Sequence, residues 1–280
     1  MQQTADFRHE YVELLKQALC ASLYDESAWR RVQGPLAEST RGKPVAAALA
    51  RAKRAIVQGI ERRGMLLVRR FSYNDDIRKE GLDWPLFGYT MTGRTRLDVL
   101  ERCLTDLLDR NVPGDIVETG VWRGGSMILA QALLKVRREN RTIWCADSFE
   151  GMPVPKGTIE GEDFSSVDYL AVSLEQVQSN FRRFGLLNDN IRFLKGWFCD
   201  TLPTAPIERI ALLRLDGDLY ESTNDALVNL YPKLSPGGYV IVDDYHSWPG
   251  CKKAVDEYRA QHGIASPIVE IDAHAVYWKA

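Results

Sequence analysis

The sequence predicts an α/β fold with a doubly wound, mostly parallel, Rossmann-like sheet, a C-terminal antiparallel strand and a helical N-terminal extension. Three observations predict this fold. A strand, a glycine-rich turn and a helix follow one another between residues 115 and 134. Strand-like and helical segments then alternate almost to the end of the chain, and apolar residues before residue 70 recur at helical spacing. Such alternation implies parallel strands joined by helices that cover both faces of the sheet.

The first 70 residues or so are expected to form helices outside the sheet. Apolar residues recur every three or four positions over residues 11–19 and 46–60, and Gly34-Pro35 separates the two runs. The second run carries many cations. It is therefore either a basic amphipathic helix that grips a partner or, as we prefer, a solvated helix packed on a neighbouring domain or subunit.

Residues 71–93 look irregular, and a segment bounded by two glycines, Gly88-Tyr89-Thr90-Met91-Thr92-Gly93, lies at their end. This segment could fold over a ligand in the main domain, or it could be a plain linker. An amphipathic helix then covers residues 97–108 and ends before Pro113-Gly114. We accordingly assign residues 1–92 to a helical extension or cap, and residues 93–280 to the α/β domain.

The α/β domain is predicted to alternate strands and helices in a regular order. The predicted strands cover residues 116–119, 142–147, 191–194, 210–216 and 238–243. The predicted helices cover residues 126–134, 173–184, 223–231 and 251–262. Residues 267–271 and 275–278 are close enough in sequence to form a terminal antiparallel pair.

Composition excludes several classes of protein. The chain has 280 residues, of which 45% are hydrophobic and 26% charged, and its net charge is −2, so we expect a globular protein with no nucleic-acid or membrane partner. We see no apolar run long enough to cross a bilayer and no secretory signal. The five cysteines are scattered and odd in number, without C-x-x-C, which predicts reduced thiols in the cytoplasm and no structural zinc site.

The turn after the first strand carries Gly120, Gly124 and Gly125, where a ligand can approach the backbone closely because no Cβ intervenes. The spacing is not the dinucleotide pattern G-x-G-x-x-G. An acid, Glu118, stands before the first glycine, which resembles the first motif of S-adenosylmethionine (SAM) dependent methyltransferases. The alternative is an ordinary tight turn between a core strand and a core helix.

Several predicted strands end in acids, and the carboxyl ends of parallel strands form the edge of the sheet where ligands bind. Asp147 follows Gly125 by 22 residues (147 − 125), close to the roughly 20 expected for the acid that holds ribose hydroxyls. Glu118 could accept a hydrogen bond from the cofactor's ammonium or from the second ribose face. Methyltransferases and dehydrogenases share the ribose acid, so this pair does not separate them.

Four aspartates, Asp216, Asp218, Asp243 and Asp244, follow the fourth and fifth strands, which should be sheet neighbours roughly 5 Å apart. Unneutralised, these carboxylates would raise one another's pKa and destabilise the fold. A hard divalent cation removes that conflict, and all-oxygen ligands suit magnesium. We therefore expect a metal site here, although Asp218 and Asp244 could instead point to solvent and cap helices. His246, near the same edge, is interpreted as a polar loop residue rather than a base.

Residues 152–167 follow the second strand without a regular pattern and include two prolines and two glycines. Loops of this length in compact domains are usually lids or disordered segments. Because this one would overhang the ligand site, we interpret it as a mobile substrate lid.

Four long motifs occur in a fixed order along the α/β domain. They are Val-Glu-Thr-Gly-Val-Trp-Arg-Gly-Gly-Ser (117–126), Ala-Asp-Ser-Phe-Glu-Gly-Met-Pro (146–153), Leu-Asp-Gly-Asp-Leu-Tyr-Glu-Ser-Thr (215–223) and Gly-Gly-Tyr-Val-Ile-Val-Asp-Asp-Tyr (237–245). Together they resemble the macrocin O-methyltransferase family over roughly residues 86–280. Members of that family are SAM- and magnesium-dependent enzymes that methylate hydroxyls on deoxysugars of macrolide and aminocoumarin antibiotics.

The resemblance implies a role for each matching residue. Asp216, Asp243 and Asp244 would hold magnesium, and Asp218 would be the general base. The residues implied to contact SAM are Glu118, Thr119, Gly120, Ser126, Asp147 and Ser148, with Trp197 and Asp200 near the adenine, and Thr90 and Met91 over the methionine end. The acceptor would be a small molecule that contains a sugar, and the long N-terminal helices favour a homo-oligomer.

The chemistry of these groups suggests a mechanism. A sugar hydroxyl is a poor nucleophile at neutral pH, and magnesium would lower its pKa and fix its direction. Asp218 would remove the proton as the oxygen attacks the methyl group in line. The positive charge of the sulfonium disappears in the transfer, so the leaving group needs no acid.

Three alternatives remain on sequence alone. A catechol-type O-methyltransferase would share the metal and the cofactor but act on a small aromatic diol. A nicotinamide-dependent dehydrogenase is weakened by the missing G-x-G-x-x-G pattern. A non-catalytic binding module is disfavoured by the carboxylate cluster.

Overall fold

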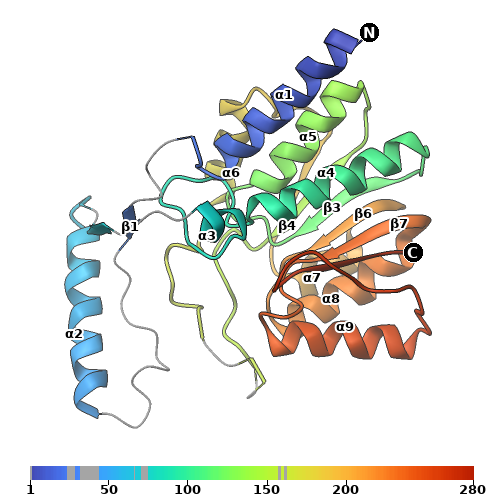
Figure 1. Ribbon diagram of the computed structural model, residues 1–280. Coiled ribbons are helices and arrows are strands. Elements are labelled where there is room, and N and C mark those ends of the chain that lie inside the picture. Colours follow the sequence, from blue (N-terminus) through green and yellow to red (C-terminus); the bar gives the residue numbers. More distant parts are fainter. Residues whose placement is uncertain are drawn as a thin grey trace.

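The structure is a computed structural model that describes residues 2–23, 29–31, 44–65, 67–70, 75–156, 159–160 and 163–280. A seven-stranded sheet in the order β5-β4-β3-β6-β7-β9-β8 forms the centre of the molecule (Figure 1). Its strands are β3 (Asp115–Thr119), β4 (Ile143–Asp147), β5 (Ile191–Lys195), β6 (Ile210–Leu215), β7 (Leu234–Val242), β8 (Val269–Glu270) and β9 (Val276–Lys279).

The sheet is doubly wound. Strands β3 to β7 run parallel, and β9 pairs antiparallel with both β7 and β8. The chain starts the sheet at β3, builds outward through β4 and β5, and then returns to the other side of β3 with β6. The switch point therefore lies between β3 and β6, where open α/β sheets bind ligands. The predicted sheet and its terminal antiparallel pair are confirmed.

Helices cover both faces of this sheet (Figure 1). On one face pack α4 (Arg94–Asp109), α5 (Gly125–Arg137) and α6 (Leu174–Arg183), and on the other α8 (Tyr220–Leu230) and α9 (Pro249–Gln261). Successive strand residues point to opposite faces, so Ile116 packs with the first group and Val117 with the second. The short helix α7 (Phe198–Thr201) and the 3-10 turns η3 (Leu202–Thr204) and η4 (Tyr231–Lys233) complete this layer.

Strand β7 and helix α8 begin earlier than their patterns predicted because of partners elsewhere in the chain. Strand β7 begins at Leu234 rather than residue 238, because its pairing with Ile210 continues across an irregular register, where a proline is tolerated. Helix α8 begins at Tyr220 rather than Thr223. The Tyr220 amide donates to the side chain of Glu160 over 2.7 Å, so a distant residue satisfies the first turn of this helix.

Helix α1 (Gln2–Leu19) packs against α4 and α5 (Figure 1). Val12, Leu15 and Leu19 are buried in the same core cluster as Leu104 of α4 and Met127 of α5. The predicted N-terminal helix therefore adds a layer to the core around the sheet. The division of the chain between residues 92 and 93 stays a prediction.

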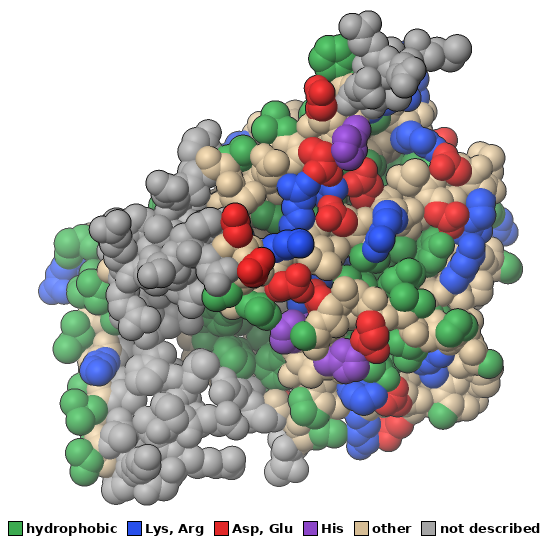
Figure 2. All heavy atoms as spheres, viewed as in Figure 1, with side chains coloured by type: hydrophobic (Ala, Val, Ile, Leu, Met, Phe, Trp, Pro, Cys, Tyr) green, Lys and Arg blue, Asp and Glu red, His purple; other side chains and the backbone are tan. Residues whose placement is uncertain are grey.

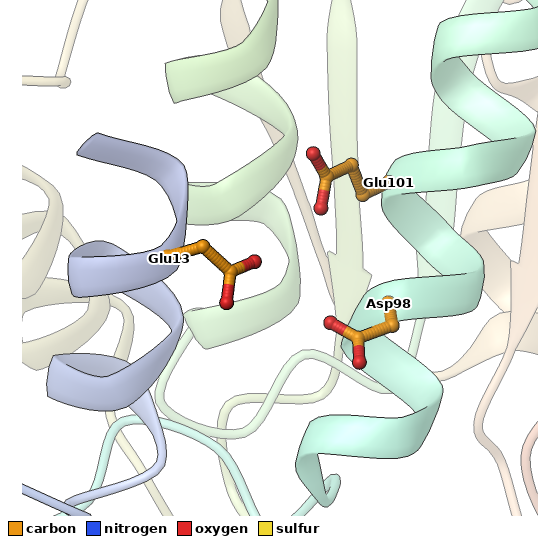
Figure 3. Close-up of side chains that lie close together, drawn as sticks. All are labelled: Glu13, Asp98 and Glu101. Carbon is orange, nitrogen blue, oxygen red and sulfur yellow. The ribbon is translucent and has the colours of Figure 1, made fainter. Parts of the chain in front are cut away.

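An ion-pair cluster strengthens the contact between α1 and α4. Figure 3 shows Glu13 of α1 pointing toward Asp98 and Glu101 of α4. Lys16 is 2% exposed and places its ammonium 2.6 Å from Glu13 and 2.7 Å from Glu101, with Asp98 as a third partner. Arg94 also pairs with Glu13. Lys16 and Arg94 therefore offset most of the negative charge of the three carboxylates.

Of the remaining N-terminal elements, α2 (Pro44–Glu61), β1 (Trp29–Arg31) and β2 (Val68–Arg70) project from the main body, whereas α3 (Asp75–Lys79) packs against α4. The two-stranded sheet of β1 and β2 lies at one end of α2, and α3 precedes α4 (Figure 1). The predicted helix over residues 46–60 is thus present. None of the helices in the described parts of the chain has the length and apolar character needed to span a bilayer.

Candidate active site

The glycine turn after β3 lies at the carboxyl edge of the sheet. Gly120 has a φ of +87°, and a Cβ on it would lie 1.7 Å from the backbone oxygen of Asp216. The Gly125 amide donates to the Tyr89 carbonyl over 2.9 Å, and a Cβ on Gly125 would lie 2.5 Å from that oxygen. The nearest neighbours of these glycines are therefore segments of the chain itself, and the turn holds β6 and the segment before α4 in place.

Asp147 fixes the same turn from the end of β4. Its Oδ2 accepts from the amides of Val121 (2.7 Å) and Trp122 (3.3 Å), and its Oδ1 accepts from the amide of Phe149 (2.7 Å). Burial raises the pKa of Asp147, and these amides lower it only in part. Ser148 Oγ lies 3.4 Å from Oδ1 as a further donor, so each oxygen already accepts from two donors. A ligand hydroxyl would replace one of the two longer contacts, from Trp122 or from Ser148.

Two cavities adjoin at this edge. The larger, of about 590 Å³, is lined by the predicted cofactor residues Gly120, Asp147, Ser148 and Trp197. The smaller, of about 300 Å³, is lined by the predicted cofactor residues Thr90, Glu118 and Ser126 and the predicted metal ligands Asp216, Asp243 and Asp244. Met91, Asp216 and Asp218 line both cavities and so stand where the two meet.

Two predicted cofactor residues line neither cavity. Thr119 is 1% exposed at the end of β3, inside the sheet. Asp200 is exposed on α7. The structure gives these two side chains no place in either cavity.

Three carboxylates converge where β6 and β7 end. Asp216, Asp243 and Asp244 each offer an oxygen, and the three oxygens lie within 4.8 Å of one another. The register explains this, because Leu215 pairs with Val242 and the acids that follow both strands start from the same level. A single ion can touch all three side chains.

Asp218 stands beside this cluster in a left-handed backbone conformation, with φ of +57°. Non-glycine residues adopt this conformation uncommonly, although aspartate does so more readily than most. Burial raises the pKa of Asp218 to about 8, and the nearby carboxylates of Asp216, Asp243 and Glu160 add to the effect. Arg214 acts in the opposite direction and only partly offsets these effects.

Arg214 supplies positive charge beneath the carboxylates. It lies within β6 and is 2% exposed. Its Nη1 donates to Glu118 (2.8 Å) and Asp216 (2.6 Å), and its Nη2 donates to Asp243 (2.5 Å) and Thr92 (2.8 Å). One guanidinium thus joins three strand ends and the segment that leads into α4.

Arg96 of α4 supplies a second positive charge. Its Nη1 donates to Asp243 Oδ2 and its Nε to Asp272 Oδ2, each over 2.6 Å. Both oxygens of Asp243 therefore face a guanidinium. Although burial acts to raise the pKa of Asp243, Arg214 and Arg96 hold it below its usual value.

Two other acids in this network are less well compensated. Burial raises the pKa of Glu118 to about 8 despite Arg214, and its Oε2 has no partner among the described residues. Burial and the carboxylates of Asp218 and Asp216 raise the pKa of Asp244 well above its usual value. The buried Oδ2 of Asp244 likewise has no partner in the described chain. These two oxygens are the open acceptors of the site.

Aromatic side chains form the other wall of the smaller cavity. Trp84, Phe164 and Trp248 line it, with ring centroids 6.1 Å apart for Trp84 and Phe164 and 5.5 Å apart for Phe164 and Trp248. Tyr169 stacks on Trp84 at 5.2 Å. The cavity therefore combines an acidic floor with an apolar wall.

Glu160 belongs to the predicted lid and is 2% exposed. It accepts from the Tyr220 amide at the start of α8. It also lies against the first turn of α9, because a Cβ on Gly250 would be 2.1 Å from Glu160 Oε2. Neither helix has a side-chain cap of its own. This carboxylate therefore sits at two helix N-termini, which favour negative charge.

Sequence reasoning missed four residues that shape the site: Arg96, Arg214, Asp272 and His274. A signal existed for Arg214, because a charged residue inside an otherwise apolar strand is buried only with partners. No comparable signal marks Arg96, Asp272 or His274. Their positions depend on contacts between segments far apart in the sequence.

Comparison with known proteins gives consistent matches. The family model described as macrocin-O-methyltransferase (TylF) matches residues 8–280. The chain is 52% identical over 217 residues to demethyldecarbamoylnovobiocin O-methyltransferase of Streptomyces niveus, which covers 75% of this chain and 83% of that protein. It is 47% identical over 221 residues to mycinamicin III 3''-O-methyltransferase of Micromonospora griseorubida. This match covers 76% of this chain and 87% of that protein.

A third relative is 8-demethyl-8-(2,3-dimethoxy-alpha-L-rhamnosyl)-tetracenomycin-C 4'-O-methyltransferase of Streptomyces olivaceus. It is 53% identical over 215 residues, which covers 73% of this chain and 80% of that protein. Among solved structures, the O-methyltransferase NovP superposes with a TM-score of 0.79 at 42% identity, covering 97% of this chain and 98% of that one.

Proposed function

The chain belongs to the macrocin O-methyltransferase family and is an O-methyltransferase, and from this premise we propose that it uses SAM and magnesium to methylate a deoxysugar hydroxyl. The acceptor would be a glycosylated natural product of the macrolide or aminocoumarin antibiotic type. One observation carries the proposal: Asp216 and Asp218 line both cavities, so acidic groups stand where a methyl donor in one cavity meets an alcohol in the other. Family membership sets aside the dehydrogenase and the non-catalytic alternatives.

The residues present fit a hard divalent cation. The donor set is all oxygen, three carboxylates converge, and the buried Oδ2 of Asp244 has no partner among the residues that the structure describes. Asp216, Asp243 and Asp244 would hold the ion. When bound there, magnesium supplies Lewis-acid polarisation of an alcohol and offsets the repulsion between the carboxylates.

The residues present also fit SAM. The larger cavity has room for a nucleoside, and Asp147 and Trp197 line it. Ribose hydroxyls would replace the long contacts that Asp147 has with Trp122 and Ser148. Glu118 Oε2 is an open acceptor in the adjoining cavity, suited to an ammonium group. When bound, SAM supplies a methyl group on a positively charged sulfur.

Asp218 is the proposed general base. It lies where the cavities meet. The three aspartates of the converging cluster would hold the ion, so Asp218 is the aspartate that is left for this task. Asp218 accepts the proton of the acceptor hydroxyl as the oxygen–methyl bond forms and the sulfur–methyl bond breaks. The products are a methyl ether, S-adenosylhomocysteine (SAH) and a proton on Asp218, so atoms and charge balance.

The second cavity supports a sugar-containing acceptor. Its acidic floor can accept hydrogen bonds from hydroxyls, and its aromatic wall suits the apolar face of a ring or an attached aglycone. One relative's name specifies a substrate with a rhamnosyl group and methylation at a 4' oxygen. A small catechol is the second candidate, because an aromatic diol would also match these two walls.

Methylation assays test the proposal. We expect turnover with SAM on at least one of demethyldecarbamoylnovobiocin, mycinamicin III and the rhamnosyl tetracenomycin substrate of the relatives, loss of turnover with EDTA, and recovery with Mg²⁺. Catechol should be a poor acceptor. Turnover on catechol alone would favour the second candidate, and undiminished turnover in EDTA would remove the metal from the proposal.

The lid and the assembly of the enzyme are also proposals. Residues 152–167 would form a substrate lid, which the position of Phe164 in the wall of the smaller cavity supports. A homo-oligomer is supported by the outward face of α2, where Val45, Leu49 and Ile56 are exposed, and Figure 2 shows hydrophobic side chains along that helix. A cytoplasmic location is supported by the five free cysteines.

A further inference from the structure

The smaller cavity is lined by two polar side chains that the proposed reaction does not use, Ser247 and His274. Ser247 follows β7, three residues after Asp244, and His274 lies in the turn between β8 and β9. Ser247 Oγ and His274 Nδ1 are 2.7 Å apart. The pair therefore shares a cavity with the acidic cluster without belonging to it.

The backbone around His274 is held firmly. Asp272 Oδ1 accepts from the amides of His274 (2.8 Å) and Ala275 (2.9 Å), and the other oxygen of Asp272 is paired with Arg96. The His274 carbonyl accepts from the His246 amide over 2.9 Å. Because Arg96 also holds Asp243, this turn and the acidic cluster are fixed by the same guanidinium.

The contact with Ser247 determines which ring atom is open to a ligand. It engages Nδ1 and leaves Nε2 as the second polar atom of the ring. A serine hydroxyl can donate or accept, so His274 can present Nε2 either as an acceptor or as a donor, depending on the tautomer. An alcohol likewise donates and accepts, which makes a hydroxyl group a matched partner for this nitrogen.

We propose that His274, oriented by Ser247, recognises a second hydroxyl group of the acceptor, close to the hydroxyl that faces Asp218. The inference rests on the proposed function, because it requires a polyhydroxylated acceptor in the smaller cavity. It adds a determinant of acceptor choice that lies outside the reacting groups. A substrate with an ether or a hydrogen at that second position would lose one or both directions of this hydrogen bond.

Two substitutions separate recognition from a structural role. In His274→Asn the amide reaches the place of Nδ1, so the contact with Ser247 is kept and the Nε2 position is lost. In His274→Gln the amide reaches the place of Nε2, so the acceptor contact is kept. A role in acceptor recognition therefore predicts that Gln is tolerated better than Asn, whereas a role in holding the turn through Ser247 predicts the reverse.

The measurement is calorimetric binding of an acceptor to the enzyme with Mg²⁺ and SAH, which cannot react. The acceptor is whichever of mycinamicin III and demethyldecarbamoylnovobiocin the wild-type enzyme methylates. The sugar of the tetracenomycin substrate carries methoxy groups at positions 2 and 3, so methylation of that substrate alone would overturn this inference. Loss of one hydrogen bond should raise the acceptor Kd of His274→Asn about 3- to 10-fold, with the Kd of SAH unchanged. His274→Gln should stay closer to wild type.

His246→Ala is the matched control. His246 is exposed, pairs with Glu270 over 2.8 Å and does not line the smaller cavity, so its acceptor Kd should not change. Equal Kd values for wild type and both His274 variants would overturn this inference and leave the proposed function standing. A larger loss in Gln than in Asn would overturn it in favour of a structural role. If the wild-type enzyme methylates none of the three acceptors, the proposed function fails, and this inference fails with it.

Discussion

Arg214 donates from Nη2 to Asp243 Oδ1 over 2.5 Å. Both side chains are buried, where either charge without the other would be strongly destabilising. The same guanidinium contacts Glu118 and Asp216, so one positive charge serves three acids. A buried carboxylate group of this size would otherwise protonate or unfold the strand ends. The pairing therefore allows the acidic cluster to exist before any ion arrives.

Replacing Arg214 should leave the repulsion between these buried carboxylates uncompensated. Breaking a buried ion pair by removing one partner costs about 3–5 kcal/mol, so Arg214→Met should lower the free energy of unfolding by that amount. Added Mg²⁺ should restore part of the loss, because it brings positive charge to the same carboxylates. Denaturant unfolding with and without Mg²⁺ measures both effects. Arg192→Met, on an exposed position of β5, is the control and should change little; equal stability of both variants would contradict the compensating role.

Asp218→Asn should separate binding from chemistry. The amide keeps the size of the side chain but cannot accept the proton, so turnover should fall about 10²- to 10⁴-fold. Thermal stabilisation by SAH should remain, and at 100 times its Kd it amounts to about 2.7 kcal/mol. Asp256→Asn, a surface carboxylate of α9 paired with Lys252, is the control. Near-normal methylation by Asp218→Asn would remove Asp218 from the role of base.

Asp244→Asn should weaken binding of a divalent cation. The substitution removes a charge whose Oδ2 has no partner in the described chain, so the loss falls on the ion rather than on the fold. Calorimetry with Mg²⁺ or Mn²⁺ should show a higher Kd.

The chain offers a matched control in its other carboxylate group. Asp98 belongs to the cluster of α1 and α4, whose centre Lys16 already occupies, so Asp98→Asn should leave the ion's affinity unchanged. If Asp98→Asn weakened binding of the ion and Asp244→Asn did not, the ion would bind at the cluster of α1 and α4 instead.

Glu118 should make stability depend on pH. Its pKa rises from the ordinary 4.5 to about 8 in the folded chain. The folded state then binds the proton more tightly than the unfolded state, so the stability it contributes is full below about pH 4.5 and is lost as pH rises toward about 8. Glu118→Gln removes this dependence. Unfolding of both proteins between about pH 5 and pH 8 should show the wild type losing stability relative to the variant; parallel curves would contradict the shift.

Cys199 offers a chemical probe of the larger cavity. It is exposed and lines that cavity, whereas Cys20, Cys103, Cys145 and Cys251 are buried. Iodoacetamide should therefore modify one thiol in the native protein, and SAH should protect it. Burial and the acids Asp200 and Asp225 raise the pKa of Cys199 above 9.0, so the rate should be slow at neutral pH and increase with pH. Cys199→Ser should remove this reaction. Unchanged modification in saturating SAH would place the cofactor elsewhere.

Much of the fold could be read from local patterns. Apolar runs that end in acids predicted β3, β4 and β6, and the motif that begins at Val117 predicted the turn into α5. The boundaries that differed depend on remote partners, since Glu160 caps α8 and Ile210 extends β7. A sequence window cannot show such contacts.

The sequence by itself determined the strands, their parallel arrangement and the acids that follow them. Apolar periodicity and the residues at strand ends are local properties. Only the tertiary structure decided which charges offset those acids and which polar groups line the smaller cavity. Arg96 comes from a helix before the sheet, and Asp272 and His274 come from the turn between its last two strands, so they meet only when the chain folds. Burial then makes the partnership necessary, because a charge without a partner has no stable place in the interior.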